Sequence, residues 1–373
     1  MHVLEIDSAD HRRAGQFLAL PFWLYRDVPT WVPPLRSEAR QQLDQRKNPF
    51  FQHSTAGFFL ALDSGDRPAG RLAVLDHRNY NAHNREQTAF FYLFECVDDP
   101  ATAQALFEAA FAWSRRRGLD RMIGPKGFSV LDGMGLLVEG FQYRPALGIP
   151  YNLPYYPALL EAIGFTGMGD ILSGYLSAAT PFPEKFHQLA SLIQERRGLR
   201  VAQFRRRNDL RQLLPHLQEM YNASIADTSG NAPITVEEVH ALANQLLWFA
   251  DPQLIKLIMK GDRIVGFLFA YPDISAALQR QRGRLFPVGW LDALIEMRRT
   301  PWVNINGAGI LQEYRGLGGT ALLFSEMEKS IRARGFQHAE LVQIGAENDR
   351  MLRELRSLGV DFYKRHRLYQ REL

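Results

Sequence analysis

An internal repeat in this 373-residue chain limits the folds that it can adopt. Three segments of the first half recur in the same order in the second half. The three pairs are GDRPAG (65–70) with GDRIVG (261–266), ALFEAAFAWSRRRGL (105–119) with LLFSEMEKSIRARGF (322–336), and LLEAIGF (159–165) with ELRSLGV (354–360). One such match arises easily by chance, but three in one order indicate two copies of the same structural unit.

The spacing of the matches indicates where the two copies differ. The offsets are 196, 217 and 195 residues, so the second copy gains 21 residues after its first matched segment and the first copy gains 22 after its second. Each GD lies between two apolar strand patterns, which is typical of a hairpin. The second matched segment of each copy reads as a helix that ends in basic residues and glycine. We therefore expect two homologous α/β units, 1–180 and 181–373.

Composition restricts the class of protein. Hydrophobic residues make up 46% of the chain and charged residues 23%, which is typical of a globular protein. The single cysteine, Cys96, excludes an internal disulfide and a multi-cysteine zinc site. A net charge of +4 is too small to indicate a nucleic-acid partner. The N-terminus shows no secretion signal and no apolar run reaches the ~18–20 residues that span a bilayer, so we expect a cytoplasmic protein.

Two histidines, His77 and His83, lie close together in the stretch DHRNYNAH. Spacing of this kind across a loop is a weak signal for a metal site, and the chain has no H-E-x-x-H motif. We expect ordinary loop histidines and no metal ion.

Glycines gather at one place in the second copy, in the stretch QEYRGLGGTALLF at 312–324. Small residues that enter a helix leave consecutive N–H groups free to bind a phosphate, and the partial positive charge of the helix end favours an anion. Arg315 adds a charge-assisted contact, whereas side chains at the glycine positions would keep a pyrophosphate away. The stretch lacks the lysine of a nucleotide-triphosphatase P-loop. The alternative is a plain turn at the start of a helix.

The order of hairpin, strand, R-x-x-G-x-G/A motif, helix, strand and asparagine-led helix resembles the GCN5-related N-acetyltransferase superfamily. Arg315 and Gly318 match its motif, whereas Thr320 stands where the superfamily has Gly or Ala. The resemblance implies an α/β (α+β) fold with two tandem domains, each a mixed, mostly antiparallel sheet flanked by helices. It also implies that the second copy binds coenzyme A through Ile310, Gln312, Arg315, Gly316, Leu317, Gly318, Gly319, Thr320 and Asn348.

Further stretches resemble a bacterial group of double-unit acyltransferases close to the ceramide synthases. They are NPFF (48–51), FFYLFE (90–95), GLLVEGF (135–141), PYNLPYY (150–156) and EYRGLG (313–318). This resemblance implies that an amine, such as a sphingoid base, attacks an acyl-CoA thioester directly. A backbone N–H near Ile310 would polarise the thioester carbonyl. The alternatives are transfer of a short acetyl group to a small amine or amino acid, and non-catalytic binding of acyl-CoA.

The first copy lacks an equivalent of the glycine loop. The stretch VDDPATAQ places Asp98, Asp99, Ala101 and Thr102 at the positions that correspond to 315, 316, 318 and 319. Carboxylates suit the start of a helix but repel a pyrophosphate. We expect the first copy to bind no coenzyme A and to shape the acceptor site or support the second copy.

The groups that transfer protons are less well defined. The superfamily often has a tyrosine acid where this chain has Leu355, and Tyr363 or Tyr369 on the last strand could replace it. Glu340 and Glu95 are candidate bases, because burial raises the pKa of a carboxyl group. Each glutamate also has a non-catalytic interpretation. Glu340 could be a solvent-facing carboxylate of the strand, and Glu95 could be a structural glutamate paired with an arginine.

The 21 additional residues of the second copy lie within 274–300. Apolar side chains, including a tryptophan, are interleaved there with arginines. This pattern is typical of a helix at a membrane interface or of a lid over a lipid-like acceptor. The alternative is an ordinary lid or a contact between the two units.

Overall fold

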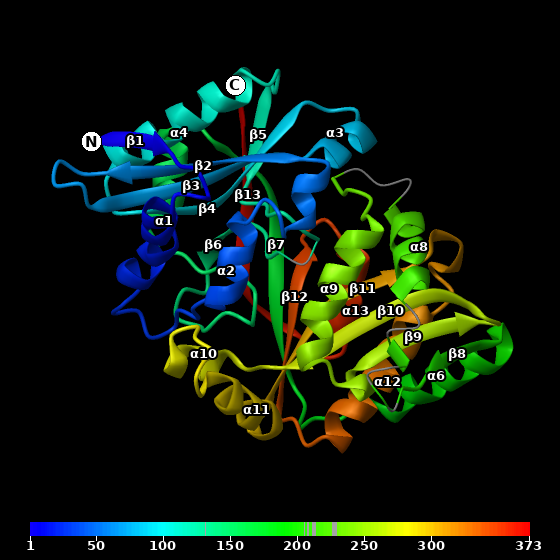
Figure 1. Cartoon of the computed structure of the whole chain (residues 1–373). Helices are drawn as coiled ribbons and strands as arrows, with labels where there is room; N and C mark the ends of the chain where they lie inside the picture. The colour runs from blue at the N-terminus through cyan, green and yellow to red at the C-terminus, as the bar shows by residue number, and fades with distance from the viewer. Residues whose placement is uncertain (131, 205, 207–208, 211–213, 226–229) are drawn as a thin grey trace.

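The computed structural model describes every residue except 131, 205, 207–208, 211–213 and 226–229. Figure 1 shows two halves whose strands form one sheet that runs through the molecule, with helices packed on its faces. The strands of the N-terminal half are β1 (His2–Glu5), β2 (Thr55–Leu62), β3 (Pro68–Asp76), β4 (Thr88–Cys96), β5 (Arg121–Gly124), β6 (Leu136–Glu139) and β7 (Thr166–Ser177). Those of the C-terminal half are β8 (Leu199–Ala202), β9 (Ile255–Lys260), β10 (Arg263–Pro272), β11 (Trp302–Ile310), β12 (His338–Gly345) and β13 (Asp361–Glu372).

The helices are distributed over both halves. In the N-terminal half they are α1 (His11–Leu24), α2 (Arg36–Leu43), α3 (Arg78–Asn84), α4 (Pro100–Arg115) and α5 (Tyr156–Ala162), with the 3-10 helix η1 (Pro49–Gln52). In the C-terminal half they are α6 (Glu184–Arg197), α8 (Leu214–Ile225), α9 (Val236–Phe249), α10 (Ser275–Gln281), α11 (Gly289–Arg299), α12 (Gly319–Ala333) and α13 (Asp349–Ser357). Two further 3-10 helices are η2 (Pro252–Leu254) and η3 (Gln312–Tyr314).

The two halves repeat one strand pattern, which confirms the fold class expected from the sequence. In each half a hairpin, β2–β3 or β9–β10, leads to a third antiparallel strand, β4 or β11. This third strand pairs in parallel with the strand that follows the long helix, β4 with β5 and β11 with β12. The remaining pairs are antiparallel. The matched sequence segments are therefore equivalent elements of a duplicated unit.

The last strand of each half lies beside a strand of the other half. β13 pairs with β5, where Tyr369 faces Gly124, and also with β7. β7 pairs in turn with β12, where Tyr175 faces Glu340. Neither half therefore closes its own edge of the sheet, because the backbone N–H and C=O groups of β5 and β12 bond to strands from the opposite copy. The division near residue 180 stays a prediction.

Each half has its own hydrophobic core. In the N-terminal half α4 packs Phe107 and Phe111 against one face of the sheet, and α1 packs Phe17 against the other. In the C-terminal half α12 packs Leu323 and Met327 against β9, β10 and β11. Apolar side chains recur at helical spacing in each of these helices, so one stripe is buried against the sheet.

The 21 additional residues of the second copy form α10 and α11, which lie against the N-terminal half (Figure 1). Gln279 Nε2 donates to the carbonyl oxygens of Pro29 at 2.8 Å and Trp31 at 2.9 Å. The Arg36 backbone N–H donates to the carbonyl oxygen of Gly283 at 2.9 Å. One face of the insertion is therefore a contact between the two units.

A buried ion pair crosses β7. Lys364 Nζ on β13 lies 2.5 Å from Glu340 Oε1 on β12, and both side chains are almost completely buried. Lys364 Nζ also donates to the carbonyl oxygen of Arg144 at 2.7 Å. Removing one partner of a buried ion pair destabilises a protein far more than removing both charges together, because the remaining charge is buried without compensation.

We predict that Lys364→Met lowers the free energy of unfolding by ~3–5 kcal/mol, because it leaves the Glu340 carboxylate buried without a cation. The double variant Lys364→Met/Glu340→Gln should lose clearly less. Urea denaturation of the wild type and both variants measures the difference. Equal losses in the single and double variants would contradict the coupling.

Candidate active site

A wedge opens between two strands of the C-terminal half. β11 and β12 pair in parallel only from Trp302 and His338 to Ile305 and Leu341. Beyond this point the register of β11 with β10 shifts, and Gly307 adopts a φ of +89°. β12 instead continues along β7. The backbone groups of β11 that face the wedge are therefore free of pairing with β12.

The glycine loop lies at the end of β11, where α12 begins. Gly316 and Gly318 have φ angles of +78° and +87°, in the left-handed region that favours glycine. A Cβ on Gly318 would lie 2.2 Å from Ile193 Cδ1, so no side chain fits there unless the Ile193 side chain moves. The N-cap residue of α12 is Gly318 itself, and no side chain caps its N–H groups. The backbone at this helix start is therefore shaped as an anion site requires.

The neighbours of the loop hold it against the core. Arg315 Nε donates to the carbonyl oxygen of Ile310 at 3.1 Å. A Cβ on Gly319 would lie 3.1 Å from Ile310 Cδ1, so this glycine packs against the end of β11. Gln312 lies in η3, and the N–H of Leu317 bonds to the carbonyl oxygen of Tyr314. The structure thus brings the predicted loop residues together, including Thr320 in the first turn of α12.

Asn348 lies just after β12, the other strand of the wedge, at the start of α13. Its side chain accepts the backbone N–H of Met351 at 3.2 Å and caps α13. Asn348 and Met351 also line the cavity described below. The asparagine therefore positions a helix start at the mouth of the wedge, and its role toward coenzyme A stays a prediction.

The first copy differs at the equivalent helix start, as the sequence indicates. The side chain of Asp99 caps α4 and accepts the N–H groups of Ala101 at 3.3 Å and Thr102 at 3.0 Å. Hydrogen bonding by Thr102 lowers the pKa of Asp99, so the carboxylate stays charged. An anionic cap occupies the place that a pyrophosphate would need.

A cavity of about 540 Å³ extends from the wedge into the N-terminal half. At the wedge it is lined by Asn306, Gly307, Ala308, Gln343, Ile344 and Gly345. Its apolar wall comes from α8, α9, β9, β10 and α12 and consists of Met220, Val239, Leu242, Ala243, Ile255, Leu257, Phe267, Phe269 and Phe324. Its polar end comes mainly from the N-terminal half and contains His77, Tyr80, Lys126, Ser129 and Asp132. The cavity therefore joins one apolar and one polar region to the wedge.

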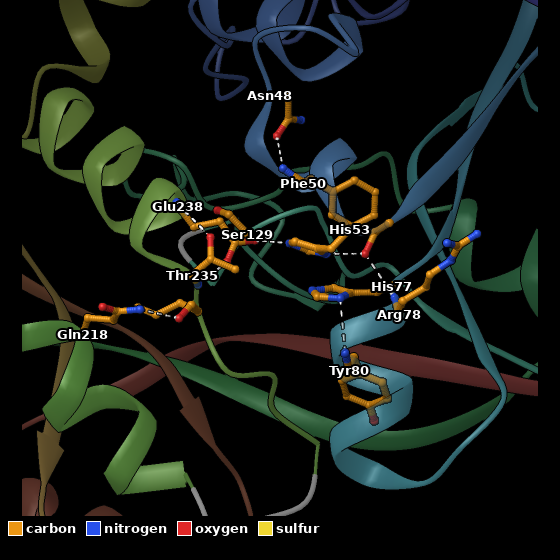
Figure 2. A network of polar contacts seen from close by, with 12 residues as sticks. Asn48, Phe50, His53, His77, Arg78, Tyr80, Ser129, Gln218, Thr235 and Glu238 are labelled. Carbon is orange, nitrogen blue, oxygen red and sulfur yellow. Dashed lines mark hydrogen bonds and ion pairs between the residues drawn. The ribbon is translucent and has the colours of Figure 1, made fainter.

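Figure 2 shows the polar contacts beside this end of the cavity. His53 Nε2 lies 3.1 Å from Glu238 Oε1 of α9, and the rings of His53 and His77 stack with centroids 5.8 Å apart. Burial acts to raise the pKa of Glu238, but hydrogen bonds from His53 and the Thr235 N–H hold it below its usual value. This network ties α9 to the N-terminal half.

The imidazole of His77 is neutral. Burial lowers its pKa to about 4, and the backbone N–H of Tyr80 donates to Nδ1 at 3.3 Å. The neutral ring therefore carries its proton on Nε2. In the part of the chain that the structure describes, no group of three or more His, Cys, Asp or Glu side chains is arranged to hold a metal ion.

Glu95 lies among tyrosines in the N-terminal half. Its Oε2 accepts the hydroxyl groups of Tyr25 at 2.5 Å and Tyr156 at 2.8 Å, and Arg71 Nη2 lies 3.9 Å from Oε1. Burial raises the pKa of Glu95, against the opposing charge of Arg71. The carboxylate is not among the residues that line the cavity. These contacts favour the structural alternative, a glutamate paired with an arginine.

The other proton-transfer candidates also lie outside the cavity lining. Glu340 is 3% exposed, so its interpretation as a solvent-facing carboxylate is wrong. Burial and the neighbouring Glu340 raise the pKa of Tyr363 well above its usual value. Tyr369 packs in the core of the N-terminal half, where its hydroxyl donates to Glu161 at 3.3 Å and burial raises its pKa to about 12. A catalytic role for these three residues stays a prediction without geometric support.

Sequence reasoning missed the polar end of the cavity. Asp132 lies in the segment where the first copy is 22 residues longer, and Glu238 and His53 lie in segments that carry no motif. His77 was interpreted as an ordinary loop histidine. The one sequence signal for this polar end is the insertion. It follows β5, the strand of the first copy that is equivalent to β12 of the wedge.

The duplicated unit, the wedge and the single glycine loop define a tandem GCN5-related N-acetyltransferase fold. The whole chain superposes on a tandem GNAT protein from the clavulanic acid biosynthesis pathway with a TM-score of 0.56, at 13% identity over 100% of this chain and 98% of that one. It also superposes on a GCN5-related N-acetyltransferase from Sphaerobacter thermophilus with a TM-score of 0.51, at 16% identity over 99% and 95%. At such identities these similarities show the fold.

Two named proteins match nearly the whole sequence. Protein YghO of Escherichia coli K12 is 27% identical over 364 residues, which cover 96% of this chain and 92% of that protein. The bacterial ceramide synthase of Caulobacter vibrioides is 27% identical over 370 residues, which cover 96% and 94%. Models of known protein families yield no match. The comparisons confirm the resemblance indicated by the motifs and support an N-acyltransferase as the class of protein.

We predict that Gly316→Asp weakens acyl-CoA binding about tenfold more than Gly316→Asn, a difference of about 1.4 kcal/mol. Asn and Asp tolerate a positive φ about equally, and a Cβ at 316 meets only Arg350 Nη1, at 3.5 Å. The variants therefore differ mainly in a negative charge at the helix start. Titration calorimetry with palmitoyl-CoA measures both affinities, and equal values would contradict an anion site here.

Proposed function

We propose that the protein is an acyl-CoA-dependent N-acyltransferase in which an amine attacks the CoA thioester directly. The observation that carries this proposal is the uncapped, glycine-lined start of α12 at the end of a strand that separates from its neighbour. The pyrophosphate binds the N–H groups of the loop, and the pantetheine arm follows the unpaired edge of β11 into the wedge. A backbone N–H of β11 then polarises the thioester carbonyl.

The acceptor or donor carries a long hydrocarbon chain. The cavity volume of about 540 Å³ lies within the range of about 300–1,000 Å³ typical of ligand sites and far exceeds the needs of an acetyl group. Its wall on α8, α9, β9 and β10 is apolar, as a lipid chain requires. The similarity to a bacterial ceramide synthase supports a sphingoid-base-like acceptor. Acetyl transfer to a small amine leaves this apolar wall unexplained.

Release of free thiol tests the proposed function. The wild type is incubated with acetyl-CoA or palmitoyl-CoA, each with sphinganine, spermidine or an amino acid. We expect thiol release with palmitoyl-CoA and sphinganine. Release only with acetyl-CoA and the small amines would favour the short-chain alternative, and tight binding without release would favour the non-catalytic one.

We predict that Ala243→Phe lowers kcat/KM for palmitoyl-CoA with sphinganine about tenfold or more relative to acetyl-CoA with the same amine. Ala243 is buried on α9 and lines the apolar wall, so a larger side chain shortens the space for a hydrocarbon chain. Ala112→Phe, on an exposed position of α4, is the matched control. Equal losses for both donors would contradict binding of the donor's acyl chain by this wall.

We further propose that the insertion of the C-terminal half contacts an anionic membrane surface. Phe286 is 80% exposed and Val288 58%, and the exposed apolar set continues along α11. We call this set the insertion surface; it consists of Phe286, Val288, Trp290, Leu291 and Ile295. Among the helices that the structure describes, none combines the length and apolar composition needed to cross a bilayer.

Arginines surround the insertion surface. Arg282, Arg284, Arg298 and Arg299 are exposed and form no ion pair with the described residues. Arg36 lies beside Arg282 and Arg284, and its pKa is lowered by burial and by the charges of Arg284, Arg40 and Arg282. Apolar side chains that project between clustered cations are complementary to a bilayer with negatively charged headgroups.

We predict that Phe286→Ser lowers binding to vesicles of phosphatidylcholine and phosphatidylglycerol at least tenfold, since a phenylalanine that leaves water contributes about 1.5–3 kcal/mol. Leu189→Ser, at a residue of α6 that is 51% exposed, is the matched control. Co-sedimentation measures binding, which should weaken with added salt. Failure of the wild type to sediment with these vesicles would refute the membrane contact.

A further inference from the structure

A loop of the N-terminal half places a carboxylate in the cavity. Asp132 lies between β5 and β6, in the segment where the first copy is 22 residues longer, and Asp132 Oδ2 accepts the backbone N–H of Ser129 at 2.9 Å. A Cβ on Gly127 would lie 2.5 Å from the same oxygen, so the glycine leaves room for the carboxylate against the backbone. The side chain is enclosed by protein and keeps partial exposure toward the cavity that it lines.

This loop is attached to the wedge of the opposite half. The backbone N–H of Met134 donates to Gln343 Oε1 at 2.8 Å, and Gln343 Nε2 donates to the carbonyl oxygen of Met134 at 3.4 Å. Gln343 belongs to β12 and lines the cavity with Asn306 and Gly307 of β11. The carboxylate therefore lies two residues from the point where the N-terminal half contacts the strand that forms one side of the wedge.

Asp132 forms no ion pair with a cation among the described residues. Glu95 and Glu340 each lie within 4 Å of a basic side chain, and Glu238 within 4 Å of His53, but the described residues contain no ion pair to Asp132. Its hydrogen-bond donors are neutral: the backbone of its own loop and, from α2, Gln42. Burial raises its pKa to about 6. A buried carboxylate that faces a cavity and has no cationic partner is suited to a cationic ligand.

The other titratable groups near the carboxylate are neutral or held elsewhere. Tyr92 of β4 faces it, and burial first, then Asp132, raise the pKa of that phenol far above its usual value. Lys126 Nζ donates to the carbonyl oxygen of Gly230 at 2.7 Å and lies 4.5 Å from the Tyr80 ring centroid. The imidazole of His77 is neutral. Burial also lowers the pKa of Lys126, to about 8. Among these groups Asp132 is the one that carries a negative charge above its pKa, so it can both attract a bound ammonium and accept its proton.

We propose that Asp132 binds the ammonium group of the acceptor and accepts its proton, so that the N-terminal half supplies the base for chemistry on the C-terminal half. This inference rests on the proposed function. The carboxylate removes one proton from R–NH3⁺, and the neutral amine attacks the thioester carbon. The C–N bond forms, the C–S bond breaks, and the second amine proton goes to the CoA thiolate. The products are an amide and CoA–SH, and Asp132 returns its proton to water.

The test compares Asp132→Asn with Asp99→Asn and Glu95→Gln. Asp132→Asn keeps the volume and an acceptor for the Ser129 N–H but loses the charge. Asp99→Asn makes the same change at a helix cap outside the cavity, and Asn is an equally good cap. Glu95→Gln tests the rival base. Each variant is assayed for palmitoyl-CoA affinity, for dodecylamine affinity by calorimetry, and for thiol release with sphinganine between pH 5 and 9.

We predict that Asp132→Asn binds palmitoyl-CoA like the wild type but binds dodecylamine at least tenfold more weakly. Its kcat/KM for the amine should fall about 10²–10⁴-fold, the contribution of a positioned base. In the wild type the Asp132 carboxylate is lost as the pH falls through about 6, so activity should decrease there. That acidic decrease should be absent from the residual activity of Asp132→Asn and present in Asp99→Asn.

Three outcomes would overturn the inference. They are unchanged amine affinity and rate in Asp132→Asn, a loss in Glu95→Gln without one in Asp132→Asn, and an acidic decrease that persists in Asp132→Asn. A wild type that releases no thiol with any amine contradicts the proposed function instead. In that case a tenfold loss of dodecylamine affinity in Asp132→Asn would still support the ammonium site, and equal affinity would refute it.

Discussion

The structure depends on the pairing of β13 between β5 and β7. This pairing satisfies the backbone groups of the central strands and joins two duplicated units into one sheet. β7 pairs in turn with β12, which forms one side of the wedge, so a strand from the N-terminal half lies directly beside the wedge. Loops from that half thus reach a site whose glycine loop belongs entirely to the other copy.

The two copies use the same helix start for different purposes. In the second copy the glycines at 316 and 318 leave the N–H groups of α12 without a side-chain cap. In the first copy Asp99 caps α4 with a charge of its own. An anion at a helix N-terminus is stabilising whether it is a ligand or a carboxylate, and the two exclude one another. The first copy therefore has no anion site at this helix start, and its residues instead line part of the cavity.

The fold was largely predictable because its signals are local and duplicated. The GD hairpins, the helices that end in basic residues and glycine, and the glycine loop each depend on residues adjacent in the chain. The candidate bases were less predictable, because Glu95 and Glu340 looked alike as acidic residues in apolar strands. Their partners come from remote segments: Tyr25 and Arg71 for one, Lys364 for the other. Only the fold shows that both are held within the protein and away from the cavity lining.

The duplication, the strand and helix order of each copy, and the presence of the glycine loop in the second copy alone could be derived from the sequence. These properties follow from periodicity and from backbone conformations that glycine alone adopts readily. Tertiary structure decided the exchange of the last strands, the cavity that spans both halves, and the position of Asp132 within it. Each of these depends on long-range pairing, and the environment of a carboxylate is set by neighbours that burial brings together rather than by residues beside it in the chain.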